Sequence, residues 1–198
     1  MTSAFLSALD VDLDCLADRS GDQIVSELEE AWTLALAEAE QRARLAGRGD
    51  IAEYLALRNS NDLLRKTGVD WLVLTFSDLA GDANRQGAAI QMSKEDDHRF
   101  HFGTATMVGQ LLTLKNGVRT LFVEGGWPRT PRDGFIRGGG LARANIRHLG
   151  LASASEHLQL TTSDRGSPRW VVIGKHGIRS ELHTTAIRRH LELLVDEK

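Results

Sequence analysis

Apolar positions recur with a helical period at the start of the chain. Small and apolar residues return every three or four positions over 24–46, after a capping box at 20–23. A second capping pattern, at 50–53, indicates that helix resumes there. We therefore predict a helical N-terminal region over residues 1–67, which ends at Gly68.

The period then changes to one typical of strands. Residues 69–76 are mainly β-branched and aromatic, which favours a strand. Two further short strands are predicted at 88–94 and 98–102, on either side of an acidic turn at 95–97.

The clearest hairpin joins residues 111–115 to 118–124 through Asn116 and Gly117, a pair typical of a type I′ turn. Alternation places four apolar residues on one face of this hairpin: Leu112, Leu114, Leu121 and Val123. It places three on the other face: Leu111, Val118 and Phe122. Both faces therefore need cover. A helix could cover one, and a closed barrel or a partner chain the other.

The last third mixes helix and strand. After a run of glycines, residues 137–149 have a helical composition. A second hairpin is predicted from 156–162 and 168–173, and a final amphipathic helix over 184–195. Its buried side would carry Ile187, Leu191, Leu194 and Val195, with His190 packed nearby.

These elements together predict an α+β fold. It has a helical N-terminal region, a central antiparallel meander sheet that could curve strongly or close into a barrel, and a C-terminal helix packed on the sheet. Residues 68–198 would form the α+β domain and share its core with residues 1–67, as one compact unit.

Composition excludes several classes of protein. The 198 residues are 41% hydrophobic and 26% charged, which is typical of a globular chain rather than a disordered one. No stretch is long and apolar enough to cross a membrane, and the N-terminus does not resemble a secretory signal. A single cysteine cannot form a disulfide within the chain. We expect a cytoplasmic protein with no membrane contact.

Charge is distributed unevenly along the chain. Residues 1–66 carry 13 acidic and 7 basic residues, a net charge of −6, whereas residues 67–198 carry a net charge of +3. Arginine outnumbers lysine 19 to 5. A GC-rich genome would give this bias, and so would recognition of phosphate or carboxylate by the planar guanidinium group.

One segment combines arginine with glycine. Residues 129–147 contain five arginines and one acidic residue. A triple glycine precedes the predicted helix, whose N-terminal amides could hold an anion, and an aromatic side chain could stack on a base. The predicted ligand-binding residues are Trp127, Arg129, Arg132, Arg137, Gly138, Gly139, Gly140, Arg143 and Arg147. Alternatively, the glycines serve a tight chain crossing and the arginines are solvated.

A second, weaker candidate is an acid–base pair. On a strand, Arg99 and His101 share one face and His98 points to the other. His101 could act with Glu124 if their strands are neighbours. The alternative is a polar pair at a sheet edge. No motif indicates a metal site or identifies a cofactor.

The leading hypothesis is a non-catalytic binding or accessory subunit that engages a phosphate-bearing ligand, nucleic acid included. One alternative is a small hydrolase or nuclease-like enzyme using His101 and Glu124. The other is a homo-oligomeric assembly protein that associates with a second copy or another protein through the alanine-lined helix 21–46.

Overall fold

The computed structural model describes residues 34–134, 136, 138, 140–164, 166–174 and 179–195. The chain divides into two compact units, residues 1–60 and residues 61–198. In the first unit, residues 34–45 are helical, and Gly47 adopts a left-handed conformation with φ +72° where that helix ends. The capping box at 20–23 and residues 24–33 of the predicted helix lie outside the described residues.

Helix α2 (Gly49–Arg85) is much longer than the sequence predicted. It does not end at Gly68, and residues 69–76, predicted as a strand, lie in its interior. Its buried residues recur with helical spacing: Val69, Leu72, Val73, Phe76 and Ala80. Packing of this apolar stripe outweighs the weak strand preference of its β-branched and aromatic residues.

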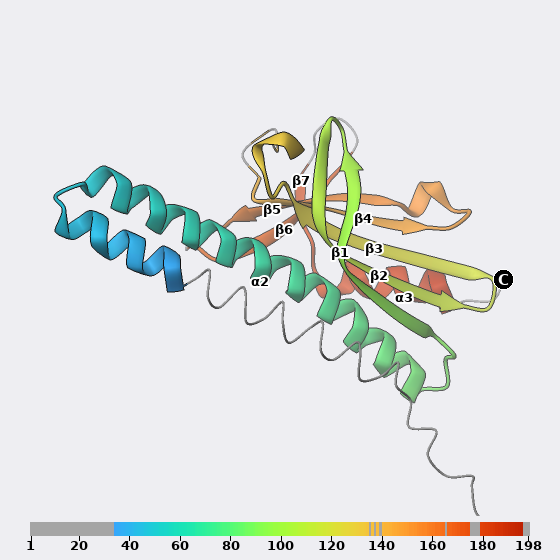
Figure 1. Ribbon diagram of the computed structural model, residues 1–198. Helices are drawn as coiled ribbons and strands as arrows, with labels where there is room; N and C mark the ends of the chain where they lie inside the picture. Colours follow the sequence, from blue (N-terminus) through green and yellow to red (C-terminus); the bar gives the residue numbers. More distant parts are fainter. Residues whose placement is uncertain are drawn as a thin grey trace, which may run out of the picture. The chain divides into compact units, whose positions relative to one another are not determined.

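The second unit contains one sheet of seven strands in chain order, each antiparallel to the next. The strands are β1 (Gln91–Phe102), β2 (Ala105–Asn116), β3 (Arg119–Trp127), β4 (Ala142–His148), β5 (Glu156–Thr162), β6 (Pro168–Ile173) and β7 (Arg179–Glu181). This open meander, with β1 and β7 as edge strands, confirms the α+β prediction and excludes the closed barrel (Figure 1).

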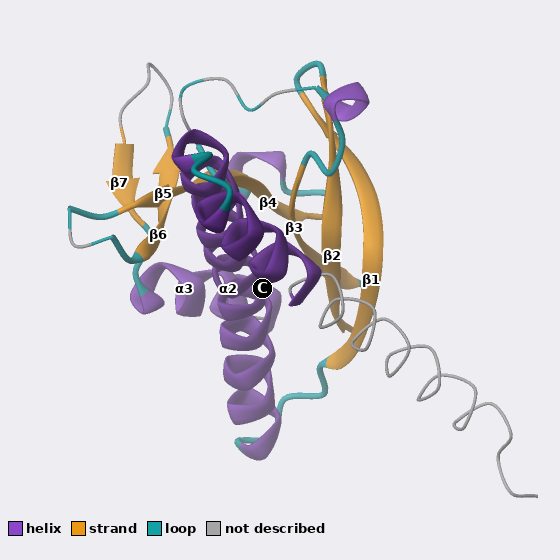
Figure 2. Ribbon diagram, turned by 60° about the vertical axis from the view of Figure 1, so that its left-hand side comes forward, coloured by secondary structure: helices purple, strands orange, loops and turns teal. Residues whose placement is uncertain are grey.

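One face of the sheet packs against α2 and the C-terminal helix α3 (Thr184–Val195), as Figure 2 shows. Leu112, Leu114, Leu121 and Val123 lie in this core, as the hairpin pattern predicted. We call the opposite face the outer face. A small apolar cluster of Phe100, Ala105 and Met107 lies there, with Ile136 packed against it.

Several elements match their predictions closely. The bounds of β5, β6 and α3 coincide with the predicted ranges. In α3, Ile187, His190, Leu191 and Leu194 are buried, while Val195 is partly buried.

Three predictions in the sheet are wrong. Strand β1 is continuous, because a bulge between Glu95 and His98 takes the place of the predicted turn. The turn between β2 and β3 is centred on Gly117 and Val118, with a positive φ at the first position only, which is the type II′ pattern. Residues 142–148 form strand β4 rather than a helix.

The loop between β3 and β4 crosses the outer face. It includes a short 3-10 helix, η1 (Pro131–Asp133), and then Ile136, which packs against the apolar cluster of that face. Further on, the carbonyl of Gly138 accepts a hydrogen bond from Gln159 Nε2 at 3.1 Å. The first part of the arginine- and glycine-rich segment is therefore a loop held against the sheet, and its last part is strand β4.

Candidate functional site

A row of polar residues crosses the centre of the outer face. The register pairs Glu124 on β3 with Asn145 on β4, and Asn145 with His157 on β5. Partners in an antiparallel pair point to the same face, so these three side chains lie side by side. Polar side chains here contrast with the apolar neighbours that face the helices, such as Val123 and Ile146.

Glu124 is the centre of the row and is 4% exposed. Its Oε1 accepts a hydrogen bond from Asn145 Nδ2 at 2.9 Å, and Arg147 Nε lies 3.4 Å from the same oxygen. Its Oε2 lies 3.1 Å from His98 Nε2. A buried carboxylate is tolerated because these donors replace the water that it loses.

His98 reaches Glu124 across an intervening strand. Strand β2 separates β1 from β3, and His98 is paired with Gly109, which is paired with Gly126. Neither glycine has a side chain to block the imidazole. The two backbones also lie too close for one, since a Cβ on Gly109 would sit 2.0 Å from the carbonyl oxygen of Gly125.

His157 is attached to the other end of the row. Its Nδ1 lies 2.7 Å from Asn145 Oδ1, and its ring meets Phe102 in an edge contact with centroids 5.5 Å apart. The side chain is otherwise exposed. Glu124, Asn145 and His157 thus form a continuous hydrogen-bonded chain that ends at the surface.

A basic pair lies beside this row. Arg143 is 7% exposed, and its guanidinium carbon lies 4.7 Å from the centre of the Phe102 ring. Burial lowers the pKa of Arg143, and the positive charge of Arg179 lowers it further. The Arg179 guanidinium also lies near the loop, with Nη2 3.7 Å from where a Cβ on Gly138 would be. Arg179 therefore lies beside Gly138, and its positive charge acts on the buried guanidinium group of Arg143.

The other predicted ligand-binding residues are dispersed. Arg147 is paired with Glu124 and lies over Phe122, while Arg129 lies over Trp127 with 4.0 Å between its guanidinium carbon and the ring centre. Trp127 is 7% exposed and offers little free surface for stacking. Arg132 is exposed on η1.

The helix expected to begin after the glycines is absent from 140–148, where the chain enters β4. The prediction that helix amides hold an anion there is therefore wrong. Gly138 accepts a hydrogen bond from Gln159 and lies beside Arg179, and Gly140 lies against the side chain of Gln159. Arg137 and Gly139 lie outside the described residues.

His101 does not meet Glu124. It is exposed, pairs with Thr106, and lies on the opposite side of β1 from His98, as strand alternation predicted. The histidines close to the Glu124 network are His98 and His157. A lone Glu at the end of an apolar strand was the sequence signal for this network, but its partners depend on the register of five strands.

A second polar cluster, which sequence reasoning missed, is buried between the sheet and α3. His148 Nε2 lies 3.0 Å from His190 Nδ1, with the rings stacked, and His190 Nε2 lies 3.4 Å from Glu156 Oε2. Burial, and then the charges of His190 and Arg119, lower the pKa of His148 to about 4.

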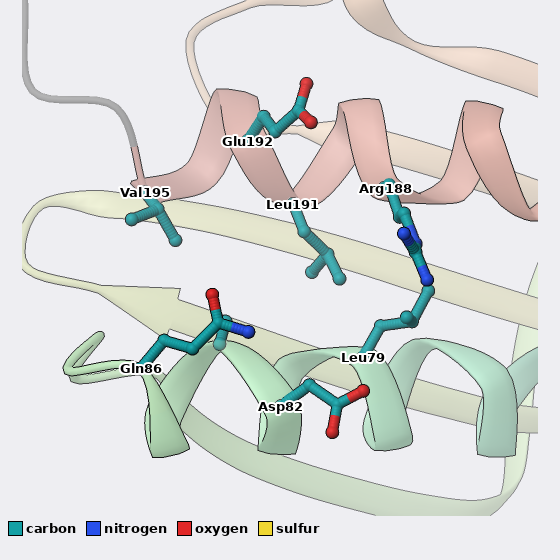
Figure 3. A pocket seen from close by; sticks show the side chains of 8 residues that line it. Leu79, Asp82, Gln86, Arg188, Leu191, Glu192 and Val195 are labelled. Carbon is teal, nitrogen blue, oxygen red and sulfur yellow. The ribbon is translucent and has the colours of Figure 1, made fainter.

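The cavities found in the second unit lie elsewhere. A groove of about 320 Å³ lies between α2 and α3. Leu191 and Val195 of α3 point toward α2 there (Figure 3). Asp82, Gln86 and Glu192 lie along its rim. Another, of about 210 Å³, is lined by residues of α2, β5 and β6.

No protein-family model, curated protein or solved structure matches the chain. Among the helices of the described residues, none combines the length and apolarity needed to cross a bilayer. In the same residues, no three His, Cys, Asp or Glu side chains gather as a metal site would require.

Proposed function

We propose that the protein is a binding or accessory subunit that takes a small phosphate-bearing ligand on the outer face, at Arg143 and Arg179. The observation that carries this proposal is a buried guanidinium group, that of Arg143, within electrostatic reach of a second one, that of Arg179, which lies beside Gly138. An anion placed between two like charges relieves their repulsion. Guanidinium groups also match phosphate oxygens with paired hydrogen bonds.

Phe102 and Gln159 support the same proposal. Phe102 holds the Arg143 guanidinium against its ring, which limits the side chain to few orientations. Gln159 is 2% exposed and fixes the loop at Gly138. A site whose side chains and loop are already held loses little entropy when a ligand binds.

The charge distribution favours a small ligand over nucleic acid. A polyanion needs basic residues spread along a surface. Arg147 is instead paired with Glu124, and Arg129 is stacked on Trp127. Two arginines of the segment are thus held by neighbouring side chains rather than spread along a binding surface.

Calorimetric titration with inorganic phosphate and pyrophosphate tests the proposal. We expect Arg179→Met to weaken binding about tenfold, since charge-assisted hydrogen bonds contribute about 1.5–3 kcal/mol. Arg188→Met, on the exposed side of α3, is the matched control. Arg143→Lys keeps the buried charge but removes the planar fork. Equal affinities of both variants and the control would refute the proposal.

A nucleic acid ligand has a different signature in the same experiment. Labelled single- and double-stranded oligonucleotides would bind with an affinity that falls steeply with salt. Strong oligonucleotide binding together with no response to pyrophosphate would replace the small-ligand proposal.

A hydrolytic enzyme is the second candidate. It is favoured by the chain from buried Glu124 through Asn145 to His157, since a carboxylate that orients a histidine is a common arrangement in general acid–base catalysis. Turnover of a chromogenic phosphomonoester or carboxylic ester, lost in Glu124→Gln, would support this candidate. The absence of turnover on both esters would count against it.

Assembly is the third proposal and concerns the first unit. Helix 21–46 falls partly outside the described residues, so its alanine-lined face is addressed by solution mass alone. A mass that rises with protein concentration, without ligand binding or turnover, would favour an assembly protein.

A further inference from the structure

We infer that the ligand of the Arg143–Arg179 site carries a hydrogen-bond donor, a hydroxyl or an amine, which it presents to Nε2 of His157. This inference rests on the proposed function and specifies its ligand class. The class is a phosphorylated polyol or, if the anion is a carboxylate, a hydroxy acid.

The argument begins at the buried carboxylate. Glu124 can only accept hydrogen bonds, so the Asn145 group that faces it at 2.9 Å is the amide nitrogen. The amide oxygen of Asn145 therefore points the other way, to His157 Nδ1 at 2.7 Å. Since that oxygen can only accept, Nδ1 of His157 carries the hydrogen.

The tautomer of His157 follows from this chain. A neutral imidazole has one hydrogen, so when Nδ1 carries it, Nε2 has a free lone pair. A solvated imidazole favours the opposite tautomer. Glu124, through Asn145, thus turns the exposed nitrogen of His157 into a hydrogen-bond acceptor.

His157 lies close enough to the arginines to share a ligand with them. Asn145 and Arg143 are alternate residues of β4, and His157 is paired with Asn145, so His157 and Arg143 are diagonal neighbours on one face. Such neighbours have Cβ atoms about 7–8 Å apart. Both side chains contact Phe102. The cross-strand row that contains His157 continues through Ile173 on β6 to Arg179 on β7.

The outer face therefore offers donors and one acceptor in a single patch. Guanidinium groups donate to the anionic part of a ligand. The acceptor at His157 is satisfied by a ligand that has a hydroxyl or amine a few bonds from its charge. When the bound anion has no such donor, Nε2 of His157 accepts a hydrogen bond from water instead.

The tautomer can be tested directly by NMR. Long-range ¹H–¹⁵N spectra of the neutral histidines should show His157 with its hydrogen on Nδ1. Exposed His101 in the same spectrum is the internal control, with its hydrogen on Nε2. In Asn145→Ala, His157 should change to the Nε2 form. A wild-type His157 that already has that form would refute the inference.

Binding tests the ligand class. Glycerol 1-phosphate and propyl phosphate have the same charge and chain length and differ in their hydroxyl groups. We expect the wild type to prefer glycerol 1-phosphate by about fivefold to tenfold, the effect of one well-placed hydrogen bond. His157→Phe should abolish the preference and keep propyl phosphate binding. His101→Phe is the matched control and should keep the preference.

The outcomes separate this inference from the proposed function. If both phosphates bind equally and Arg179→Met weakens both, the phosphate site stands and the donor inference is wrong. If neither phosphate binds, and glycerate binds no better than propionate, the proposed function fails. If glycerate binds better than propionate and no phosphate binds, the ligand is a hydroxy acid and the donor inference is supported.

Discussion

The buried histidine pair should make the stability of the fold depend on pH. His148 and His190 are 8% and 4% exposed, and Glu156 lies beyond His190. Glu156 accepts, so Nε2 of His190 faces it with a hydrogen, and Nδ1 of His190 can accept from His148 Nε2. Neutral His148 is satisfied by this donation. Protonation of His148 would place a second hydrogen among buried groups and near Arg119.

The size of the effect follows from the pKa of His148, which falls from 6.5 to about 4 on folding. The unfolded chain binds a proton at His148 between these two values and the folded chain does not, so stability is complete above pH 6.5 and is lost as the pH falls toward 4. From pH 7.5 to pH 5 the loss amounts to about 2 kcal/mol. Glu156, whose pKa is lowered chiefly by His190, adds a loss in the same direction below its ordinary value of 4.5.

Urea denaturation at pH 7.5 and at pH 5 measures this loss. His148→Gln keeps a donor for His190 Nδ1 and cannot be protonated, so it should lose about 2 kcal/mol less than the wild type over this interval. The histidines that do not contact His148 are common to both proteins, so their contribution cancels from the comparison. Equal losses in the two proteins would refute the assignment of a depressed pKa to His148.

Two further predictions concern the contact of α2 with the sheet. Gly68→Ala should destabilise the protein, because a Cβ there would lie 2.6 Å from Leu160 Cδ1. Gly81→Ala should stabilise the helix by up to about 1 kcal/mol, because only Arg85 Nη1 lies near, at 3.6 Å. Thermal melts that rank the two variants the other way would contradict this packing. Trp170→Phe removes the buried 2.8 Å hydrogen bond from Nε1 to the Gly68 carbonyl and should cost about 1–3 kcal/mol in urea denaturation, and no loss would contradict the bond.

Local patterns were sufficient where pairing is between neighbours in the chain. The hairpin of β5 and β6 and the helix α3 were predicted with their bounds, because turn residues and amphipathic period act over short distances. The hairpin of β2 and β3 was also predicted, although its turn moved by one residue. The shift keeps Leu112, Leu114, Leu121 and Val123 on their predicted buried face, but it moves Val118 from a predicted strand position into the turn, where it is exposed.

Composition was misleading where it disagreed with period. Residues 69–76 have a strand-like composition, yet Val69, Leu72, Val73 and Phe76 follow the helical spacing. Residues 142–148 have a helix-like composition, rich in Ala and Arg. Their alternate positions Ala142, Ala144, Ile146 and His148 all face the helices. In both segments the position of the apolar residues was the better guide.

The site depends on relations that no local pattern contains. His98 meets Glu124 only because β1 has a bulge that changes the face of the residues after it, and because a pair of glycines lies between the two side chains. The bulge is marked by Asp97, whose φ is +56°, a left-handed conformation that aspartate adopts more readily than most residues.

The arginine-rich segment shows how one charge pattern is divided by the fold. Once residues 142–148 form a strand, Arg143 and Arg147 both lie on the outer face, on either side of the row that contains Glu124 and Asn145. Arg147 forms an ion pair with Glu124 from the neighbouring row. Arg143 is instead paired across the sheet with buried Gln159. Arg179, outside the segment, is brought beside Arg143 by the short edge strand β7. The net charge of the segment is therefore not enough to predict an anion site. The register of the strands determines which side chains lie beside each arginine, as with Glu124 beside Arg147 and Arg179 near Arg143.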